Sequence, residues 1–397
     1  MYSHRRLFLE HCAQTSPKPI GLEIMKARGM YLTDIHNKRY MDLISGISVS
    51  ALGHSHPDVV RAVQKQAKTY MHLMVYGEYV QHPQVKAAQA LVEMLPENLN
   101  SVYFTNSGSE AVEAAMKLAK RVSGRSEIIA MENAYHGSTQ GALSLMGSEY
   151  FRDAFRPLLP GIRHLRFNHH DDLEKITKQT AAVFCETIQG EAGAVVPDIE
   201  WMQALRQRCS ETGALLVLDE IQCGMGRTGT FSAFEQFDIV PDILLLAKGL
   251  GGGMPIGAMV TDKDRMDKFS TNPVLGHITT FGGHPVSCAA ALATLRHIKK
   301  NKLWENAKKA ETEFRSKLTH HKIKKISGRG LLLAVEFSHT EENLSIVELC
   351  INNGYITDWF LFNDKSLRLA PPLIITEKQI NQAAKGIVNA IDKHDLV

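Results

Sequence analysis

The sequence predicts an α/β fold with two domains, a large one built on a mostly parallel sheet covered by helices and a smaller α+β one. Its 397 residues exceed the length of a typical single domain. Between about residues 100 and 260, short apolar runs alternate with amphipathic stretches, as in βαβ units. After about residue 287 the pattern changes to longer helical segments followed by short strands.

The strands of the large sheet are expected at a series of short apolar runs in the middle of the chain. Each run is apolar at almost every position, which indicates strands buried on both faces between layers of helices. Amphipathic helix patterns lie between several of them. The runs are SVYFT, EIIAM, AAVFCE, ALLVLD, DILLLA and GAMV.

The two ends of the chain are expected to form the smaller domain together. CAAALATLRHIKK and the lysine-rich stretch up to Lys325 predict long helices, and short strands are expected around LLLAVEF and LRLAPPL. Near the N-terminus, EIMKARGMYLTD resembles strands and HNKR a turn. We therefore expect residues 1–50 to join the small domain, residues 51–288 to form the large domain, and residues 289–397 to complete the small one.

Charge, hydropathy and cysteine content exclude several classes of protein. Lys and Arg total 45 against 42 acidic residues, and a net charge of +3 does not predict nucleic acid or an anionic membrane as a partner. No apolar run approaches the ~20 residues that span a bilayer, and Glu10 and His11 interrupt the N-terminal apolar stretch, unlike a signal-peptide core. The six cysteines contain no CxxC pair, so we expect no metal site and reduced thiols in the cytoplasm. A small molecule is the expected partner.

The first chemical signal is a strand, a tight turn and a helix at SVYFTNSGSE. Ser107 and Glu110 have the spacing of a capping box, and Gly108 allows a ligand to approach the free backbone amides. The start of this helix is therefore a candidate site for an anion such as phosphate. The same spacing also fits a plain capped helix without a ligand.

The second signal is Asp219, at the end of the buried strand ALLVLD. In open α/β sheets ligands bind beyond the carboxyl ends of the strands, so this acid can meet a protonated ring nitrogen or a ribose hydroxyl. The following GMGRTG matches a dinucleotide-binding GxGxxG literally. We disfavour that interpretation because the glycines do not follow the strand directly and no amphipathic helix opens on the last of them.

The third signal is Lys248, just past the buried strand DILLLA and before a glycine-rich loop. Desolvation lowers the pKa of a lysine, which leaves a neutral amine able to react with an aldehyde. A surface lysine after a strand is the alternative. Together, an anion-binding helix start, an acid and a lysine at neighbouring strand ends describe a site for pyridoxal phosphate.

Several long motifs resemble the class III (ω-amino acid) aminotransferases of pyridoxal phosphate fold type I, most closely the acetylornithine/ornithine branch. They occur in the order found in that family and cover nearly the whole chain. The motifs are KRYMDLISGISVSALGHSHP, YFTNSGSEAVEAAMKLAKR, ETIQGEAGAVVP, LVLDEIQCGMGRTGTFSAFE, PDILLLAKGLGGGMPIGA, ITTFGGHPVSCAAAL and LRLAPPLIIT.

The resemblance implies a cofactor role for each matching residue. Lys248 corresponds to the lysine that binds the cofactor covalently and moves protons, and Asp219 to the acid that pairs with the ring nitrogen. Ile221 and Tyr135 would flank the ring, and Thr280 would reach the phosphate from the other subunit. The remaining matches are Gln222 as donor to the ring phenolate oxygen, Ser107, Gly108 and Ser109 as phosphate cradle, and His136 and Glu186 as neighbours of the ring.

The substrate side follows the family less closely. Arg368 matches its carboxylate-binding arginine, and Glu191 an acid of its EPxQGExG segment, in which Thr187 here replaces proline, a change expected to affect only backbone stiffness. Ser138 stands where acetylornithine, ornithine and 4-aminobutyrate aminotransferases have arginine. Ile47 occupies the position at which ornithine enzymes place tyrosine.

The expected function is amino-group transfer by a homodimer whose active sites are shared between the subunits. An ω-amino donor, acetylornithine-like or related, passes its nitrogen to a 2-oxo acid such as 2-oxoglutarate. The alternatives are a 4-aminobutyrate or other ω-amine transaminase, a class III racemase or aminomutase, a NAD-dependent dehydrogenase that uses GMGRTG, and a non-catalytic binding protein of this fold.

Overall fold

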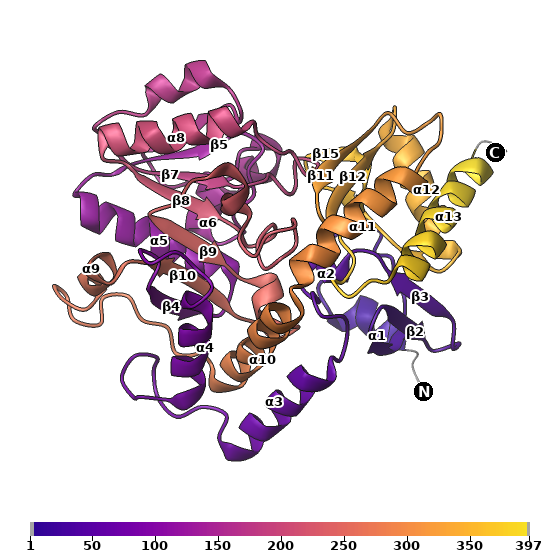
Figure 1. Cartoon of the computed structure of the whole chain (residues 1–397), viewed down its shortest axis with the longest axis horizontal. Helices are drawn as coiled ribbons and strands as arrows, with labels where there is room; N and C mark the ends of the chain where they lie inside the picture. The colour runs from indigo at the N-terminus through magenta and orange to yellow at the C-terminus, as the bar shows by residue number, and fades with distance from the viewer. Residues whose placement is uncertain (1–3, 395–397) are drawn as a thin grey trace.

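A seven-stranded sheet forms the centre of the larger lobe in the computed structural model, which describes residues 4–394 (Figure 1). Only β10 runs antiparallel to its neighbours, and the other pairs are parallel. Six of the strands lie at the predicted apolar runs. The sheet order is β4 (Ser101–Thr105), β10 (Gly257–Thr261), β9 (Ile243–Leu246), β8 (Leu215–Asp219), β7 (Thr180–Glu186), β5 (Glu127–Met131) and β6 (Ile162–Leu165).

The edge strand β6 was missing from the prediction. Its residues alternate between partly exposed and exposed positions before one buried residue, so it lacks the continuous apolar run that reveals the central strands. In β8, by contrast, Leu215 and Val217 pack with helix α5 (Gly108–Ser123) on one face of the sheet. Leu216 and Leu218 pack with helix α8 (Ile199–Thr212) on the other. This two-sided burial explains the uniform hydrophobicity and confirms the predicted α/β class.

The parallel strands place the chemical residues along one edge of the sheet. Because β4, β5, β7, β8 and β9 run in the same direction, the segments that follow them meet at their carboxyl ends. The strand ends carry Glu186 and Asp219, and the segments after the strands carry Ser107, Tyr135 and Lys248. Residues from distant parts of the sequence are thereby collected in one place.

The smaller lobe contains a four-stranded sheet covered by helices (Figure 1). The helical stretch expected up to Lys325 ends earlier, at Lys317. The N–H of Lys324 donates to the carbonyl of Glu336, and Lys325 pairs with the same residue, so this part of the chain is already committed to the sheet. The elements are α11 (Leu303–Lys317), β11 (Lys325–Arg329), β12 (Leu332–Glu336), α12 (Thr340–Asn352), β14 (Trp359–Phe360), β15 (Asn363–Leu369) and α13 (Glu377–His394).

The N-terminal segment lies beside the C-terminal part of the chain. The N–H of Leu43 donates to the carbonyl of Ile356, and the N–H of Ala370 to that of Leu43, over 2.9 and 2.7 Å. The outermost residues of the two expected segments, 1–3 and 395–397, lie outside the described residues, and the domain limits themselves stay a prediction. The sheet here joins β1 (Ile24–Arg28), β2 (Tyr31–Asp34), β3 (Arg39–Asp42) and β13 (Tyr355–Ile356) in that order.

The remaining helices surround the sheets. Helix α10 (Pro285–Asn301) packs against α3 (Pro57–Thr69) and α4 (His82–Val92) at the base of the molecule (Figure 1). Among the described residues, no helix combines the length and the apolar character needed to cross a membrane. Shorter helices are α1 (His4–His11), α2 (Ser45–Ser48), α6 (Gln140–Leu145), α7 (Glu149–Arg152) and α9 (Lys263–Met266).

Candidate active site

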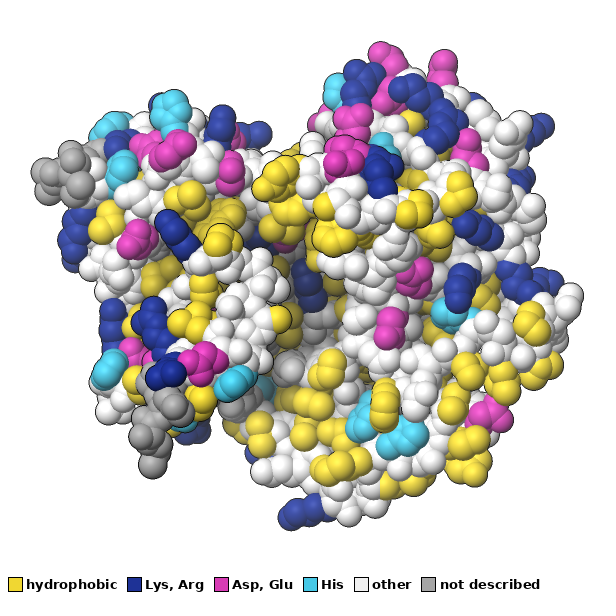
Figure 2. Space-filling model, turned by 180° about the vertical axis from the view of Figure 1, so that it is seen from behind, with side chains coloured by type: hydrophobic (Ala, Val, Ile, Leu, Met, Phe, Trp, Pro, Cys, Tyr) yellow, Lys and Arg dark blue, Asp and Glu magenta, His cyan; other side chains and the backbone are white. Residues whose placement is uncertain are grey.

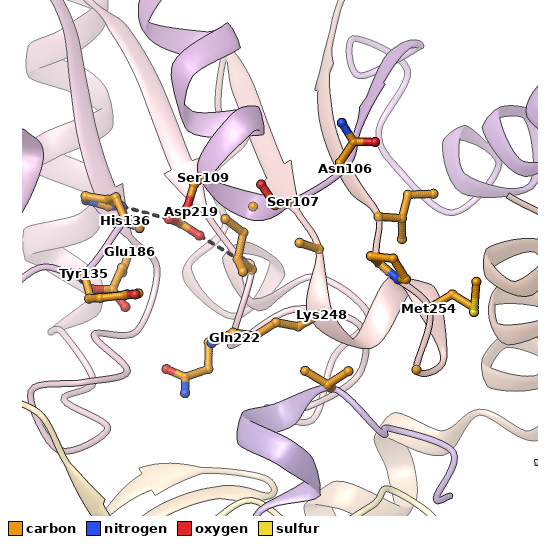
Figure 3. A pocket seen from close by; sticks show the side chains of 18 residues that line it. Asn106, Ser107, Ser109, Tyr135, His136, Glu186, Asp219, Gln222, Lys248 and Met254 are labelled. Atoms are coloured by element: carbon orange, nitrogen blue, oxygen red, sulfur yellow. Dashed lines mark hydrogen bonds and ion pairs between the residues drawn. The ribbon is translucent and has the colours of Figure 1, made fainter. Parts of the chain in front are cut away.

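A cavity of about 440 Å³ lies at the carboxyl edge of the large sheet and is lined by 18 residues (Figure 3). It gathers side chains from five strand ends and from the glycine-rich loop after Lys248. The cavity therefore unites the three chemical signals of the sequence. Its predicted members are Ser107, Gly108, Ser109, Tyr135, His136, Glu186, Asp219, Ile221, Gln222 and Lys248.

Lys248 follows β9 after a single residue, Ala247, and points into this cavity (Figure 3). Its backbone has a φ of +40°, a left-handed conformation that is strained for a residue with a side chain. Burial of its amine lowers the pKa of Lys248, and the charge of Glu191 opposes that shift only in part. The fold thus favours a neutral amine at this position.

Asp219 and His136 form a buried pair on the side of the cavity that faces β8 (Figure 3). Asp219 Oδ2 lies 2.8 Å from His136 Nδ1, and Asp219 Oδ1 accepts a 2.9 Å hydrogen bond from the N–H of Ile221. Burial on its own lowers the pKa of His136, but the hydrogen bond and charge of Asp219, with the charge of Glu186, raise it overall. The pair therefore favours a protonated His136 beside Asp219.

The start of helix α5 forms another wall of the cavity. Ser107 is its N-cap residue, and the hydroxyl of Ser107 accepts a 3.2 Å hydrogen bond from the N–H of Glu110. The expected capping box is only half correct, because the Glu110 carboxylate accepts from the N–H of Asn106 instead of the N-cap N–H. A Cβ on Gly108 would lie 2.7 Å from Cδ1 of Ile221, so a side chain here would have to displace Ile221. The first amides of the helix have no partners within it and favour an anion.

Glu186 closes the cavity opposite Lys248. Its carboxylate accepts hydrogen bonds from the N–H groups of Tyr135 and Gly190, over 3.0 and 2.8 Å. Burial raises the pKa of Glu186 to about 7. A Cβ on Gly190 would overlap the Gln222 side chain, which explains a glycine at this point of the QGE sequence.

Arg368 and Glu191 form a buried ion pair next to the cavity. Arg368 donates from both terminal nitrogens to the two Glu191 oxygens, each over 2.8 Å, and Gln222 donates to the same carboxylate over 3.3 Å. Asp358 Oδ1 lies 3.0 Å from Arg368 Nε. The predicted carboxylate anchor is therefore bound by the protein's own acids.

Besides Arg368 and Glu191, three of the predicted site residues lie outside the cavity. Thr280 is exposed, and its carbonyl oxygen accepts a 2.9 Å hydrogen bond from His72 Nε2. Ser138 is also exposed, with its hydroxyl 3.3 Å from that of Tyr135. Ile47 is half-buried within α2.

Sequence reasoning missed several residues that the fold brings to the site. Asn106 and Val49 line the cavity, and the position of Asn106 directly before the predicted phosphate cradle could have indicated it. Thr187 is fully buried and donates a 3.0 Å hydrogen bond to Glu220, so it does more than change backbone stiffness. No local pattern points to Asp358, because its contact depends on how the smaller lobe folds.

One cluster of possible metal ligands lies away from the cavity, where helices α3 and α10 meet. Ligand atoms of His56, Asp58 and His297 lie within 4.8 Å of one another. Arg61 pairs with Asp58, and the positive end of the α3 dipole faces the cluster. Both charges disfavour a cation, and we assign no metal to it.

Known proteins resemble the chain over almost its whole length. The Aminotransferase class-III family model matches residues 12–391. An acetylornithine aminotransferase of Methanopyrus kandleri is 38% identical over 93% of this chain and 94% of its own. A Pyrococcus horikoshii protein provisionally named LysW-aminoadipate semialdehyde/glutamate semialdehyde transaminase is 39% identical over 93% and 96%.

Solved structures agree with the sequence relatives. The ornithine aminotransferase of Toxoplasma gondii superimposes with a TM-score of 0.92 at 30% identity, covering 98% of this chain and 94% of that one. Another structure of that enzyme, with a TM-score of 0.91, has pyridoxal phosphate at its active site in partial occupancy. The predicted family, fold type and cofactor are thus confirmed. The chain belongs to the class III aminotransferases, a family of enzymes that depend on pyridoxal phosphate.

Proposed function

We propose that Lys248 binds pyridoxal phosphate in the cavity and that the enzyme moves an amino group from an ω-amino donor, acetylornithine-like or related, to a 2-oxo acid such as 2-oxoglutarate. The observation that carries this proposal is the convergence, in one cavity, of a half-buried lysine, the Asp219–His136 pair and the start of helix α5.

The residues present fit the cofactor. The cavity volume of about 440 Å³ falls in the usual range for small-molecule sites, about 300–1,000 Å³. The phosphate would lie at Ser107, Gly108 and Ser109, where the N-terminus of a 16-residue helix favours negative charge. The ring would lie between Ile221 and Tyr135, which both line the cavity.

When bound, pyridoxal phosphate supplies an aldehyde for covalent attachment of amines and a ring that delocalises the electron pair of a deprotonated carbon. Lys248, whose pKa burial lowers, would hold the aldehyde and, as a neutral amine, would take and return the substrate proton. Asp219, paired with His136, would keep the ring nitrogen protonated. Gln222 would donate to the phenolate oxygen.

Arg368 would bind a substrate carboxylate, which must first replace Glu191 on the guanidinium. The exposed Ser138 leaves the second carboxylate subsite without the usual arginine, so donors that need that arginine should be poor. The names of the relatives support an acetylornithine-like donor. A 4-aminobutyrate or other ω-amine donor, and racemase or aminomutase chemistry at the same lysine, are the alternatives.

Two further features belong to this proposal. Thr280, exposed and outside its own cavity, would reach the phosphate of a partner subunit in a homodimer. Hydrophobic side chains and histidines gather toward the lower end of the larger lobe (Figure 2). A groove of about 840 Å³ includes Val80, which is 95% exposed, and Val274. All six cysteines are free thiols, five of them buried, which supports a cytoplasmic location.

A half-reaction screen tests the donor class. The holoenzyme is mixed with N-acetylornithine, ornithine, 4-aminobutyrate or an uncharged amine, and conversion of the cofactor is followed by absorbance. Ser138→Arg should improve donors that need an arginine at this position about ten- to a hundredfold in kcat/KM, the value of a charge-assisted contact. If the wild type already uses N-acetylornithine as well as its best donor, Ser138 does not determine specificity. Repeated turnover of a donor into its isomer without a 2-oxo acid would favour a racemase or aminomutase.

A further inference from the structure

Arg368 has contacts on every edge of its guanidinium group. The end edge, made by the two terminal nitrogens, faces both Glu191 oxygens. On the side edge, Nε lies 3.0 Å from Asp358 Oδ1, and a terminal nitrogen donates to the carbonyl of Trp359 over 2.7 Å. The Phe360 ring lies under the face, 4.5 Å from the guanidinium carbon. One arginine is thus shared by two acids.

The two acids are held in different ways. Glu191 receives additional hydrogen bonds from Gln222, which lines the cavity, and from the N–H of Leu361. Asp358 lies on the opposite side of the guanidinium, one residue before Trp359, and the N–H of Arg368 donates to its carbonyl oxygen over 2.9 Å. Among the described residues, neither Asp358 Oδ1 nor Arg368 Nε completes a hydrogen bond, so the contact between them acts mainly through charge.

When a substrate carboxylate binds Arg368, it replaces the Glu191 carboxylate, so one negative group takes the place of another. The incoming carboxylate takes the edge that Glu191 leaves, so the repulsion exerted by Asp358 is similar before and after the exchange. What Asp358 supplies is orientation. Its charge beside Nε keeps the other edge of the guanidinium turned toward the position that Glu191 and the substrate carboxylate occupy in turn.

We propose that Asp358 is a positioning residue, a permanent counter-ion that holds Arg368 by its Nε edge while Glu191 and a substrate carboxylate exchange at the other edge. This inference rests on the proposed function and deepens it. It assigns to Asp358 the recognition of carboxylate substrates, but no part in the proton transfers at Lys248.

The test measures binding apart from turnover. Glutarate is a dicarboxylate like 2-oxoglutarate but has no oxo group, so it cannot react. Calorimetry on the holoenzyme with Asp358→Asn should show a glutarate Kd raised about tenfold, the low end for a contact to a charged group. Asp364→Asn is the matched control, because it removes the same charge from an exposed position on the same strand as Arg368 and should leave the Kd unchanged.

Kinetics separates positioning from a general structural effect. Asp358→Asn should raise KM for 2-oxoglutarate and leave kcat, and the half-reaction with an uncharged amine, within about twofold. Loss of every activity together with a lower melting temperature would mean only that the variant folds badly. The pH dependence of the wild type then provides the decisive measurement.

Burial raises the pKa of Asp358 to about 6, and the charged groups that face it are Arg368, Glu191 and Asp42. Protonation of Asp358 as the pH falls through this range removes its charge, so the glutarate Kd should rise more steeply toward low pH for the wild type than for Asp358→Asn, in which the protonation of glutarate itself still occurs. Protonation of Glu186, whose pKa is about 7, would have the opposite effect and strengthen binding of an anion.

Three results would overturn the inference. The first is an unchanged or lower glutarate Kd in Asp358→Asn. The second is a wild-type enzyme that transaminates 2-oxoglutarate but does not bind glutarate. The third applies if Asp358→Asn does not fold, and is a wild-type glutarate Kd that does not rise toward low pH. Absence of transamination with every donor would instead contradict the proposed function, and glutarate binding would still decide the role of Asp358.

Discussion

Lys248 owes its expected reactivity to its surroundings. Its amine lies deep beside a cavity, and burial lowers its pKa, so a neutral nucleophile forms at a pH at which exposed lysines stay charged. Asp219 lies in the same cavity and pairs with His136 over 2.8 Å. Two neighbouring groups are thus prepared for opposite tasks, one as a base and one as a fixed charge.

The first prediction is that Lys248→Ala abolishes the covalent link to the cofactor. The wild type should be yellow, and borohydride reduction followed by peptide mapping should label Lys248. The variant should lose at least about a hundredfold in kcat, the lower range for removing a proton-transfer group. A label on another lysine, or a colourless wild type that added cofactor does not restore, would contradict the assignment.

The second prediction concerns the charge of Asp219. Asp219→Asn should keep part of the cofactor but lose about a hundredfold in kcat, because the ring nitrogen loses its ionic partner. Asp238→Asn is the control, since Asp238 is exposed and its φ of +53° suits asparagine. Comparable rates for the two variants would show that Asp219 has been misassigned.

At the scale of elements, Gly108 at the start of helix α5 lies directly against the side chain of Ile221. Gly108→Ala should weaken cofactor binding about tenfold, since the new Cβ lies 2.7 Å from Ile221 Cδ1 and overpacking costs ~1–3 kcal/mol. Ile221→Val removes that carbon, so the double variant should recover most of the affinity in a fluorescence titration of the apoenzyme. If it does not recover, the glycine is required by the backbone and not by its contact with Ile221.

The loop after β8 is tied to the loop after β7 by a buried carboxylate. Glu220 accepts hydrogen bonds from the N–H groups of Ala233 and Phe234 and from the Thr187 hydroxyl. Thr187→Val keeps the shape but removes one donor, so the free energy of unfolding should fall by ~1–3 kcal/mol.

Chemical denaturation measures this loss. Thr69→Val is the control, because it removes an exposed hydroxyl that bonds only within its own helix. Equal stability of the two variants would show that the buried hydrogen bond contributes nothing to the fold.

At the scale of the whole molecule, the exposed position of Thr280 predicts active sites shared between subunits. Thr280→Asp should inactivate the enzyme because it sets a carboxylate against the cofactor phosphate in the partner subunit. Lys248→Ala should be inactive because it lacks the lysine that binds the cofactor. In a mixed dimer, one site combines the intact Lys248 of one chain with the intact Thr280 of the other. Random mixing of the two variants should therefore restore about a quarter of the wild-type activity.

Subunit exchange followed by an assay tests this complementation. Each variant remixed with itself is the control and should stay inactive. No recovery from a mixture shown to contain mixed dimers, or full activity of a monomer at assay dilution, would contradict a shared site.

The sequence by itself determined the chemistry at the strand ends. Ser107, Asp219 and Lys248 each follow an apolar run directly, and parallel strands bring their carboxyl ends together, so the site could be predicted from local order. The uniform apolar character of the central runs likewise fixed the three-layered sheet. Strand β6, which is partly exposed, had no such signal.

Only the tertiary structure decided which groups meet across the chain. Arg368 and Glu191 are 177 positions apart, and Asp219 and His136 are 83 apart. Such pairs depend on the packing of one lobe or loop against another, and no periodicity in the sequence encodes that packing. Three other features arise in the same way: the second acid on Arg368, the capping box at Ser107 of which only half forms, and the buried partner of Thr187. Each requires a polar group to find its partner once the chain has excluded water.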